Sequence, residues 1–349
     1  MATEVYVYLK RIKKIIALLL LLACNSQMQA QPIKNLVFEG AGMRGIAYCG
    51  AIRELEEKGI IKDVERVGGT SAGAITALAL SLGYSADEIA RIISQTNFKK
   101  FNDGRFMFAG GINRMNKYFG WYKGEQFNKW LEKLIAAKAG NENITFQELS
   151  SRGFKDLYVT ATCLNRQQLV ILSKETYPAM RIKDAVRISM SIPLYFEAVF
   201  IDSLGQVIDH PKNKQQLDVM TDGGLTGNFP IRIFDSSRYV NPSAENVFLH
   251  NSATIGFRID REEQIANDQS TAALAPMPVG NIKEYASAFY NMIIEKLNRQ
   301  ALSTEDWQRT VSISDGSIGP RIRRLSKSTV STLMENGRIA TKNYLHYKD

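Results

Sequence analysis

The stretch from Gly69 to Gly73 holds the most reactive pattern of this sequence, a serine at position 71 with glycines two residues away on either side. Apolar residues 64–67 predict a strand before Ser71, and residues 74–82 predict a helix after it. A sharp strand-to-helix turn exposes a serine hydroxyl, and flanking glycines let neighbouring backbone approach closely. The start of a helix also stabilises a developing alkoxide. We therefore predict that Ser71 is a nucleophile on an elbow shaped by Gly69 and Gly73.

A second glycine motif, Gly40-Ala41-Gly42-Met43-Arg44-Gly45, follows the predicted strand 33–38. One interpretation is a dinucleotide-binding fingerprint, which expects an acidic residue at the end of the next strand. Asp63 and Glu65 stand instead at the start of that strand. The other interpretation is an oxyanion hole, in which backbone N–H groups stabilise a tetrahedral intermediate. It explains both glycine motifs with one reaction and assigns the donors to Gly42, Met43, Arg44 and Gly45.

A serine nucleophile needs a base within hydrogen-bond reach. The chain has only three histidines, which are His210, His250 and His346. A carboxylate is therefore the leading candidate. Asp222 ends the apolar stretch 217–221 and precedes Gly223 and Gly224, so on a parallel sheet it reaches the same edge as the other strand-to-helix turns. The alternative is a turn residue that caps the two glycines.

The order of the predicted elements indicates an α/β fold with a mostly parallel sheet. A strand, a glycine turn and a helix occur twice within about sixty residues. Ser85-Ala86-Asp87-Glu88 predicts a capping box that starts a further helix. Residues 326–345 predict an amphipathic helix. Since no linker divides residues 31–349, we predict one large domain with a C-terminal helical extension.

The first thirty residues have the layout of an export signal. Four basic residues within positions 10–14 precede an apolar run, 15–23, that is too short to cross a bilayer. Leu21-Leu22-Ala23-Cys24 is similar to a lipobox, whose cysteine becomes lipidated, while Met28-Gln29-Ala30 fits a small-x-small cleavage site only loosely. We expect residues 1–30 to be a signal peptide, lipidation at Cys24, and a protein that is exported to a bacterial cell envelope or secreted.

Charge and composition limit the classes of binding partner but do not identify one. The chain carries a formal net charge of +9, which suits an anionic lipid surface, nucleic acid or solubility equally, and no nucleic-acid motif occurs. Residues 98–130 mix aromatic and basic side chains, a composition that suits a lipid interface or a long connection whose rings pack onto the core. With so few histidines, and with Cys49 and Cys163 far apart in the chain, a metal site has few ligands to draw on.

Together and in this order, the Gly40–Gly45 loop, the Ser71 elbow and Asp222-Gly223-Gly224 resemble the three signature motifs of the patatin-like phospholipases. Residues 185–196 and 228–230 are similar to further segments of that family. The resemblance runs from about residue 33 to 259 and implies a three-layer αβα sandwich. It also implies a Ser-Asp dyad without histidine, with Ser71 as acyl acceptor and Asp222 as proton acceptor. One departure is Ala41, which stands where many members have a third glycine.

The resemblance implies a lipid acyl hydrolase that forms an acyl-enzyme, needs no cofactor or metal, and works on lipid at a membrane surface. Two other functions stay open, an envelope-anchored lipid-binding protein with an inactive site and a dinucleotide-binding protein that uses the Gly40–Gly45 loop. Arg44 either steers a phosphate headgroup or holds that loop. The lipid substrate and the oligomeric state do not follow from the sequence.

Overall fold

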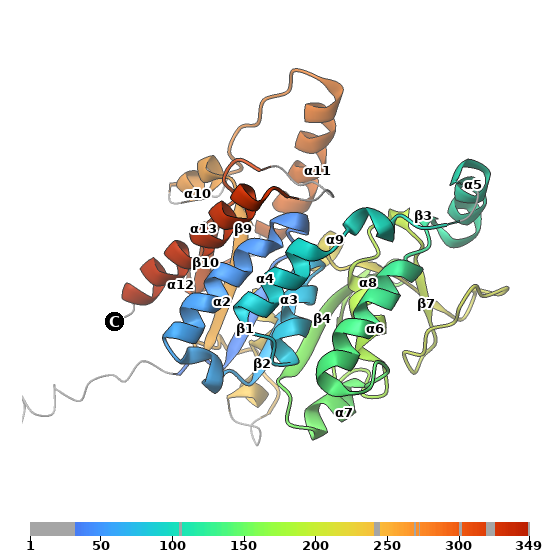
Figure 1. Cartoon of the computed structure of the whole chain (residues 1–349), viewed down its shortest axis with the longest axis horizontal. Helices are drawn as coiled ribbons and strands as arrows, with labels where there is room; N and C mark the ends of the chain where they lie inside the picture. The colour runs from blue at the N-terminus through green and yellow to red at the C-terminus, as the bar shows by residue number, and fades with distance from the viewer. Residues whose placement is uncertain are drawn as a thin grey trace, which may run out of the picture. The chain divides into compact units, whose positions relative to one another are not determined.

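Eight strands form the central sheet, in the spatial order β10-β9-β1-β2-β4-β8-β7 with β5 also paired to β4 (Figure 1). In this computed structural model its strands are β1 (Asn35–Phe38), β2 (Arg66–Gly69), β4 (Asp156–Cys163), β5 (Gln168–Leu172), β7 (Val199–Ile201), β8 (Asp218–Asp222), β9 (Thr254–Asp260) and β10 (Thr310–Ser314). A separate two-stranded sheet joins β3 (Gly120–Tyr122) to β6 (Leu194–Phe196).

The structure describes residues 32–104, 107–240, 245–268, 270–271, 273–299, 302–318 and 325–347. The chain from Pro32 to Tyr347 is one compact unit that contains all of these residues. The predicted signal peptide, residues 1–30 with Cys24, lies outside the described residues. Among the helices that are described, none has the length and apolar character that crossing a membrane requires.

Helices connect and cover the strands, with η marking a 3-10 helix. They are η1 (Gly42–Ile46), α2 (Ala47–Glu57), η2 (Ile60–Asp63), α3 (Ala72–Ser81), α4 (Ala86–Gln95), η3 (Phe98–Phe101), α5 (Met107–Tyr118), α6 (Glu125–Ala139), α7 (Phe146–Ser151), α8 (Ile182–Ser189), α9 (Gly224–Gly227), η4 (Ile231–Phe234), η5 (Ser237–Tyr239), α10 (Glu262–Asp268), α11 (Ile282–Arg299), α12 (Thr304–Gln308) and α13 (Lys327–His346). The capping box predicted at Ser85 is present at the start of α4.

Strand direction changes at β4. From β10 to β4 the strands run parallel, whereas β5 and β8 run antiparallel to β4. The predicted mostly parallel sheet is confirmed, but the expected parallel direction of the strand that ends at Asp222 is wrong. The physical reason is the connection from β7 to β8, residues 202–217, which contains no helix. Parallel neighbours need a crossover, usually helical, while antiparallel neighbours do not.

The core lies on both faces of the sheet because side chains alternate along each strand. In β1, Leu36 and Phe38 belong to the larger core cluster, which α2, α3, α8 and α13 also enter. Val37 belongs to a smaller cluster with Tyr158 and Phe234, beside η4 and η5. The predicted three-layer arrangement is confirmed, and short 3-10 helices contribute much of its second outer layer.

The last helix packs tightly on the first long one, α13 against α2 (Figure 1). A Cβ on Gly50 would lie 1.7 Å from the Met334 carbonyl oxygen, and one on Gly337 would lie 2.0 Å from the Ala47 oxygen. The two backbones meet at these glycines because neither carries a side chain. Leu333 is fully buried. The predicted C-terminal helix therefore forms part of the core.

Candidate active site

Ser71 stands at the turn from β2 to α3 with φ 53° and ψ −118°. This left-handed conformation is strained for a residue with a side chain. The flanking glycines permit it, since a Cβ on Gly69 would lie 2.5 Å from the Gly73 carbonyl carbon and one on Gly73 would lie 2.2 Å from the Phe38 oxygen. The predicted strand, elbow and helix around Ser71 are therefore present.

Asp222 ends β8 opposite Ala161, two residues beyond the level at which β2 ends. Its carboxyl group is buried and accepts a hydrogen bond from the Gly224 N–H at 2.7 Å. Burial raises the pKa of Asp222 to about 6, against the opposing effect of hydrogen bonds from the Gly224 N–H and the Ser71 side chain. A carboxyl group with this pKa can accept a proton at neutral pH.

The end of α8 contacts both of these residues. Ser189 Oγ accepts a hydrogen bond from the Ser71 N–H at 2.9 Å, and the Ser191 carbonyl accepts one from the Asp222 N–H at 2.9 Å. Met190 Sδ lies 3.3 Å from Ser71 Oγ. The single hydroxyl proton of Ser71 can face this sulfur or the Asp222 carboxylate, and the ionised carboxylate is the stronger acceptor.

Arg187 fixes the segment 189–191 through hydrogen bonds. Its buried guanidinium donates hydrogen bonds to Ser191 Oγ and to the carbonyls of Lys123, at 2.8 Å, and Glu197, at 3.3 Å. Burial lowers the pKa of Arg187 to about 10, against the opposing charge of Glu197. The group therefore stays charged at neutral pH and ties α8 to the strands β3 and β6.

The glycine loop before α2 lies beside the elbow. Gly42, Met43 and Gly45 line the same cavity as Ser71, and Gly42 adopts φ 55°. Asn228 fastens the start of the loop, because its carbonyl accepts the Gly40 N–H and its Nδ2 donates to the Gly40 carbonyl, both at 3.1 Å. Backbone amides are therefore available close to the nucleophile.

Arg44 differs from its neighbours in the loop. Its N–H donates to the Ala41 carbonyl at 3.2 Å, and its guanidinium forms an ion pair with Asp315 at 3.2 Å. These contacts fit the interpretation of Arg44 as a residue that holds the loop. The amides of Arg44 and Gly45 are both engaged within the 3-10 helix η1, so of the four predicted donors Gly42 and Met43, at the start of η1, remain.

A narrow cavity of about 80 Å³ opens beside Ser71 and is almost entirely apolar. Aromatic rings pack against one another along it, with centroids 5.2 Å apart for Phe101 and Phe127 and 5.7 Å apart for Phe127 and Trp130. Its other apolar side chains include Ile75, Ile93, Phe98, Ile192 and Phe196. Several aromatic residues of the stretch 98–130 thus form the wall of this apolar cavity.

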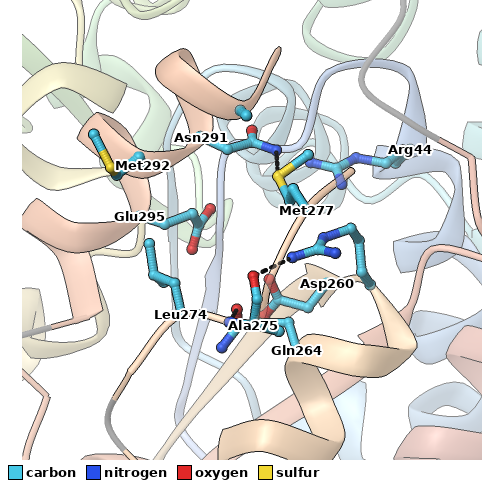
Figure 2. A pocket seen from close by; sticks show the side chains of 11 residues that line it. Arg44, Asp260, Gln264, Leu274, Ala275, Met277, Asn291, Met292 and Glu295 are labelled. Carbon is cyan, nitrogen blue, oxygen red and sulfur yellow. Dashed lines mark hydrogen bonds between the residues drawn. The ribbon is translucent and has the colours of Figure 1, made fainter. Parts of the chain in front are cut away.

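A second cavity, of about 220 Å³, lies against the other side of Arg44 (Figure 2). Figure 2 shows Arg44 and Glu295 at opposite sides of this cavity, and Glu295 comes from α11. Arg258 joins Glu295 to the core through a buried ion-pair network with Glu39, at 3.6 Å, and Asp260, at 2.7 Å. Since Glu39 directly precedes the glycine loop, this ion-pair network fixes the start of the loop to the core.

The three histidines, all of which are described, lie outside the lining of the Ser71 cavity. Among the described residues, one group has the spacing of metal ligands, namely Asp235, His250 and Asp306. Arg309 forms ion pairs with both carboxylates of this group. Guanidinium thus already occupies the place that a cation would take.

A family model described as Patatin-like phospholipase matches residues 36–235, which is more than half of the chain and includes both Ser71 and Asp222. The chain belongs to the patatin-like phospholipase family. Within that family it is 32% identical over 214 residues to the uncharacterised protein YqhO of Bacillus subtilis, covering 58% of this chain and 67% of YqhO.

Two further likenesses agree with this membership. The patatin-like chain is 29% identical over 201 residues to a protein of Invertebrate iridescent virus 6 named Probable lipid hydrolase 463L, covering 57% of this chain and 62% of that protein. It therefore spans 62% to 67% of the length of these two curated relatives. The crystal structure of VipD from Legionella pneumophila matches with a TM-score of 0.53 at 17% identity, over 90% of this chain and 67% of VipD, which shows the fold alone.

The structure of this patatin-like chain brings most of the predicted site residues together. Gly223 fits tightly behind the site, since a Cβ there would lie 2.4 Å from Thr160 Oγ1. Asp63 and Glu65, the candidates for a ribose contact, precede β2 and so lie at the opposite edge of the sheet. Sequence reasoning missed the roles of Ser189, Ser191 and Asn228. The available signal was that all three fall in the family-like segments 185–196 and 228–230.

Proposed function

We propose that this chain hydrolyses carboxylic esters of lipids, with Ser71 as nucleophile and Asp222 as base. One observation carries the proposal: a serine on a strained turn and a buried carboxyl group with a pKa of about 6 meet beside an apolar cavity. Membership of the patatin-like phospholipase family and similarity to a viral protein named a lipid hydrolase support lipids as the substrate class.

The proposed reaction has two steps. In the first, Asp222 accepts the hydroxyl proton of Ser71 while Ser71 Oγ bonds to the ester carbonyl carbon. The tetrahedral intermediate then collapses, the alcohol leaves with the proton from Asp222, and the acyl group stays on Ser71. In the second, Asp222 accepts a proton from water as the water oxygen attacks the acyl carbon. Release of the fatty acid returns that proton to Ser71.

The surrounding residues have distinct parts in this mechanism. The N–H groups of Gly42 and Met43, at the start of η1 and in the lining of the cavity, serve as donors to the developing oxyanion, and one such donor contributes about 3 kcal/mol to the barrier reduction. The apolar cavity holds the acyl chain and excludes water. Ser189 positions the nucleophile by accepting the Ser71 N–H at its hydroxyl oxygen. Ser191 positions the base by accepting the Asp222 N–H at its carbonyl oxygen.

The test is covalent labelling with a fluorophosphonate together with hydrolysis of a soluble p-nitrophenyl ester. We expect labelling of Ser71 in the unaltered chain and loss of both labelling and hydrolysis in Ser71→Ala. Asp222→Asn should lower the hydrolysis rate by about 10³-fold or more, because general-base assistance typically contributes that much. Retention of ester hydrolysis by folded Ser71→Ala would contradict the proposal.

A matched control separates chemistry from folding. Ser81 is a buried serine at the far end of α3, the helix that Ser71 caps, and it donates its hydroxyl to the Lys155 carbonyl. Ser81→Ala should therefore remove a buried hydrogen bond while fluorophosphonate labelling of Ser71 continues at the normal rate. If the unaltered chain binds lipid but never reacts with the probe, it is a lipid-binding protein with an inactive site.

A further inference from the structure

Two exposed apolar side chains sit on strained backbone next to each other. Phe119 has φ 65° and is 40% exposed, and Leu194 has φ 66° and is 65% exposed. They are neighbours because Leu194 pairs with Gly120 across the small sheet. Left-handed backbone is rare for bulky residues, and exposure gives these side chains no burial energy in return. Residues held in this way cluster at functional positions.

Leu194 lies close to the Ser71 cavity along β6. Phe196, which follows Leu194 by two residues, lines that cavity, as does Asn102. Tyr195, which lies between Leu194 and Phe196, donates its hydroxyl to Asn102 Oδ1 at 2.7 Å. Neither Phe119 nor Leu194 lines the cavity itself.

The α5 helix extends the same apolar area. Ile112 is 44% exposed and belongs to α5, which ends at Tyr118 directly before Phe119. Figure 1 shows α5 projecting from the part of the molecule that carries β3. We use the term docking surface for Ile112, Phe119 and Leu194 together.

The segment that carries Phe119 is rich in basic residues, although Arg114 is buried beside Glu197 and Lys123 pairs with Glu125. The chain from position 98 to 124 contains six basic residues and one acidic residue, a formal net charge of +5. That acidic residue, Asp103, turns its carboxylate to the backbone N–H groups of Gly124 and Gln126. Lys117 is exposed, and Lys214 Nζ lies 4.7 Å from the centre of the Phe119 ring. An apolar area with a basic rim fits an anionic bilayer, which supplies both acyl chains and negative charge.

We propose that the docking surface binds an anionic phospholipid membrane and delivers lipid to the Ser71 cavity. This inference rests on the proposed lipid hydrolysis and names the surface from which the substrate enters. Apolar side chains of the docking surface insert among the acyl chains, while Lys117 and Lys214 face the phosphates. The strained backbone of Phe119 and Leu194 holds both side chains outward.

The experiment measures co-sedimentation with vesicles of phosphatidylglycerol and phosphatidylcholine, and with phosphatidylcholine alone. It uses the compact unit from residue 32 onward with Ser71→Ala, so that neither the leader nor hydrolysis affects binding. The test variant is Phe119→Asn with Leu194→Asn, since asparagine tolerates left-handed backbone. We expect at least a tenfold loss of affinity for the anionic vesicles. Lys117→Gln with Lys214→Gln should remove the preference for anionic over neutral vesicles.

The matched control is Val247→Asn with Phe248→Asn. These side chains are 55% and 62% exposed and precede β9, whose start lies at the sheet edge opposite the ends of β1 and β2. The control should bind vesicles as tightly as the parent. Equal vesicle binding by parent and docking-surface variant would overturn the proposal. So would a parent that sediments as a dimer and a docking-surface variant that sediments as a monomer, because the surface would then join two copies.

Failure of the docking surface and failure of the proposed chemistry give different results. With Ser71 intact, the Phe119→Asn, Leu194→Asn variant should hydrolyse a soluble p-nitrophenyl ester at the normal rate and hydrolyse vesicle lipid at least tenfold more slowly. Loss of soluble-ester hydrolysis in the parent would contradict the chemistry alone. Normal hydrolysis of vesicle lipid by the variant would contradict the docking surface alone.

Discussion

The carboxyl group of Asp222 sets the pH range in which the proposed reaction runs. Burial raises its pKa to about 6, and it must be ionised to accept the Ser71 proton. We expect kcat for a soluble ester to rise about tenfold per pH unit below pH 6 and to level off above about pH 7. A pH–rate profile measured between pH 4.5 and 8.5 checks this. A profile that is flat through this range would show that another group acts as base.

The ionised form of the same carboxyl group destabilises the folded state, because it is buried. Its pKa in the folded state lies above the ordinary value of 3.8, so its favourable contribution is complete below about pH 4 and is lost as the pH rises through 6. Asp222→Asn should therefore raise the free energy of unfolding by about 1–3 kcal/mol at pH 8 and leave it nearly unchanged at pH 3.5. Urea unfolding at the two pH values measures the difference. A variant that is less stable at pH 8 would refute this account.

Ser189 is a positioning residue whose hydroxyl accepts the Ser71 N–H. Ser189→Ala leaves this donor without its partner on a strained turn, an effect of about 1–3 kcal/mol. We expect kcat for a soluble ester and the rate of fluorophosphonate labelling to fall together by about tenfold, with KM unchanged. Ser81→Ala serves as the control because it removes a buried hydroxyl at the other end of α3. Equal labelling rates in the two variants would mean that Ser189 does not position the nucleophile.

At the scale of whole elements, the contact between α2 and α13 is the most exacting one. Gly50→Ala or Gly337→Ala would drive a methyl group into backbone that lies within 2.0 Å of its position. Either substitution should lower the free energy of unfolding by about 3 kcal/mol or more, which is the upper range for overpacking. Gly280→Ala is the control, since a Cβ there meets only Glu284 at 3.4 Å. Thermal denaturation of the three variants measures the contrast.

The elements that could be predicted are those with local signals. The Ser71 elbow, the Gly40–Gly45 loop and the Ser85 capping box each depend on a few adjacent residues, and the structure contains all three. The direction of β8 depends on its neighbours β4 and β7, to both of which it runs antiparallel. An apolar run followed by two glycines carries no information about those neighbours, so the parallel direction that it suggests is wrong. Asp222 still reaches the elbow because β4 extends beyond β2.

Residues that act across the fold left weaker signals. Ser189 and Ser191 hold Ser71 and Asp222 through contacts between segments far apart in the chain, and no local pattern marks such contacts. The aromatic residues of the stretch 98–130 suited either a lipid interface or packing. The structure divides them, with Phe101 in the wall of the Ser71 cavity and Phe119 exposed to solvent.

For the molecule as a whole, the sequence predicts a lipid anchor at Cys24. We expect the full chain, expressed in bacteria, to incorporate a labelled fatty acid that Cys24→Ser does not incorporate. Cys163→Ala is the control, because Cys163 is free but buried and should not affect labelling. Acylation that persists in Cys24→Ser would place the anchor elsewhere. A secreted protein without any label would indicate cleavage after Ala30 instead.

The pairing of α2 with α13 also affects the order in which the chain can fold during synthesis. α2 is among the first helices to leave the ribosome, yet the backbone that covers Gly50 belongs to residue 334, near the end of translation. β9 and β10, which complete one side of the sheet, are also made late. The native topology therefore closes only after almost the whole polypeptide has emerged. Contacts between parts so far apart in the chain form slowly, because the long loop between them must close first.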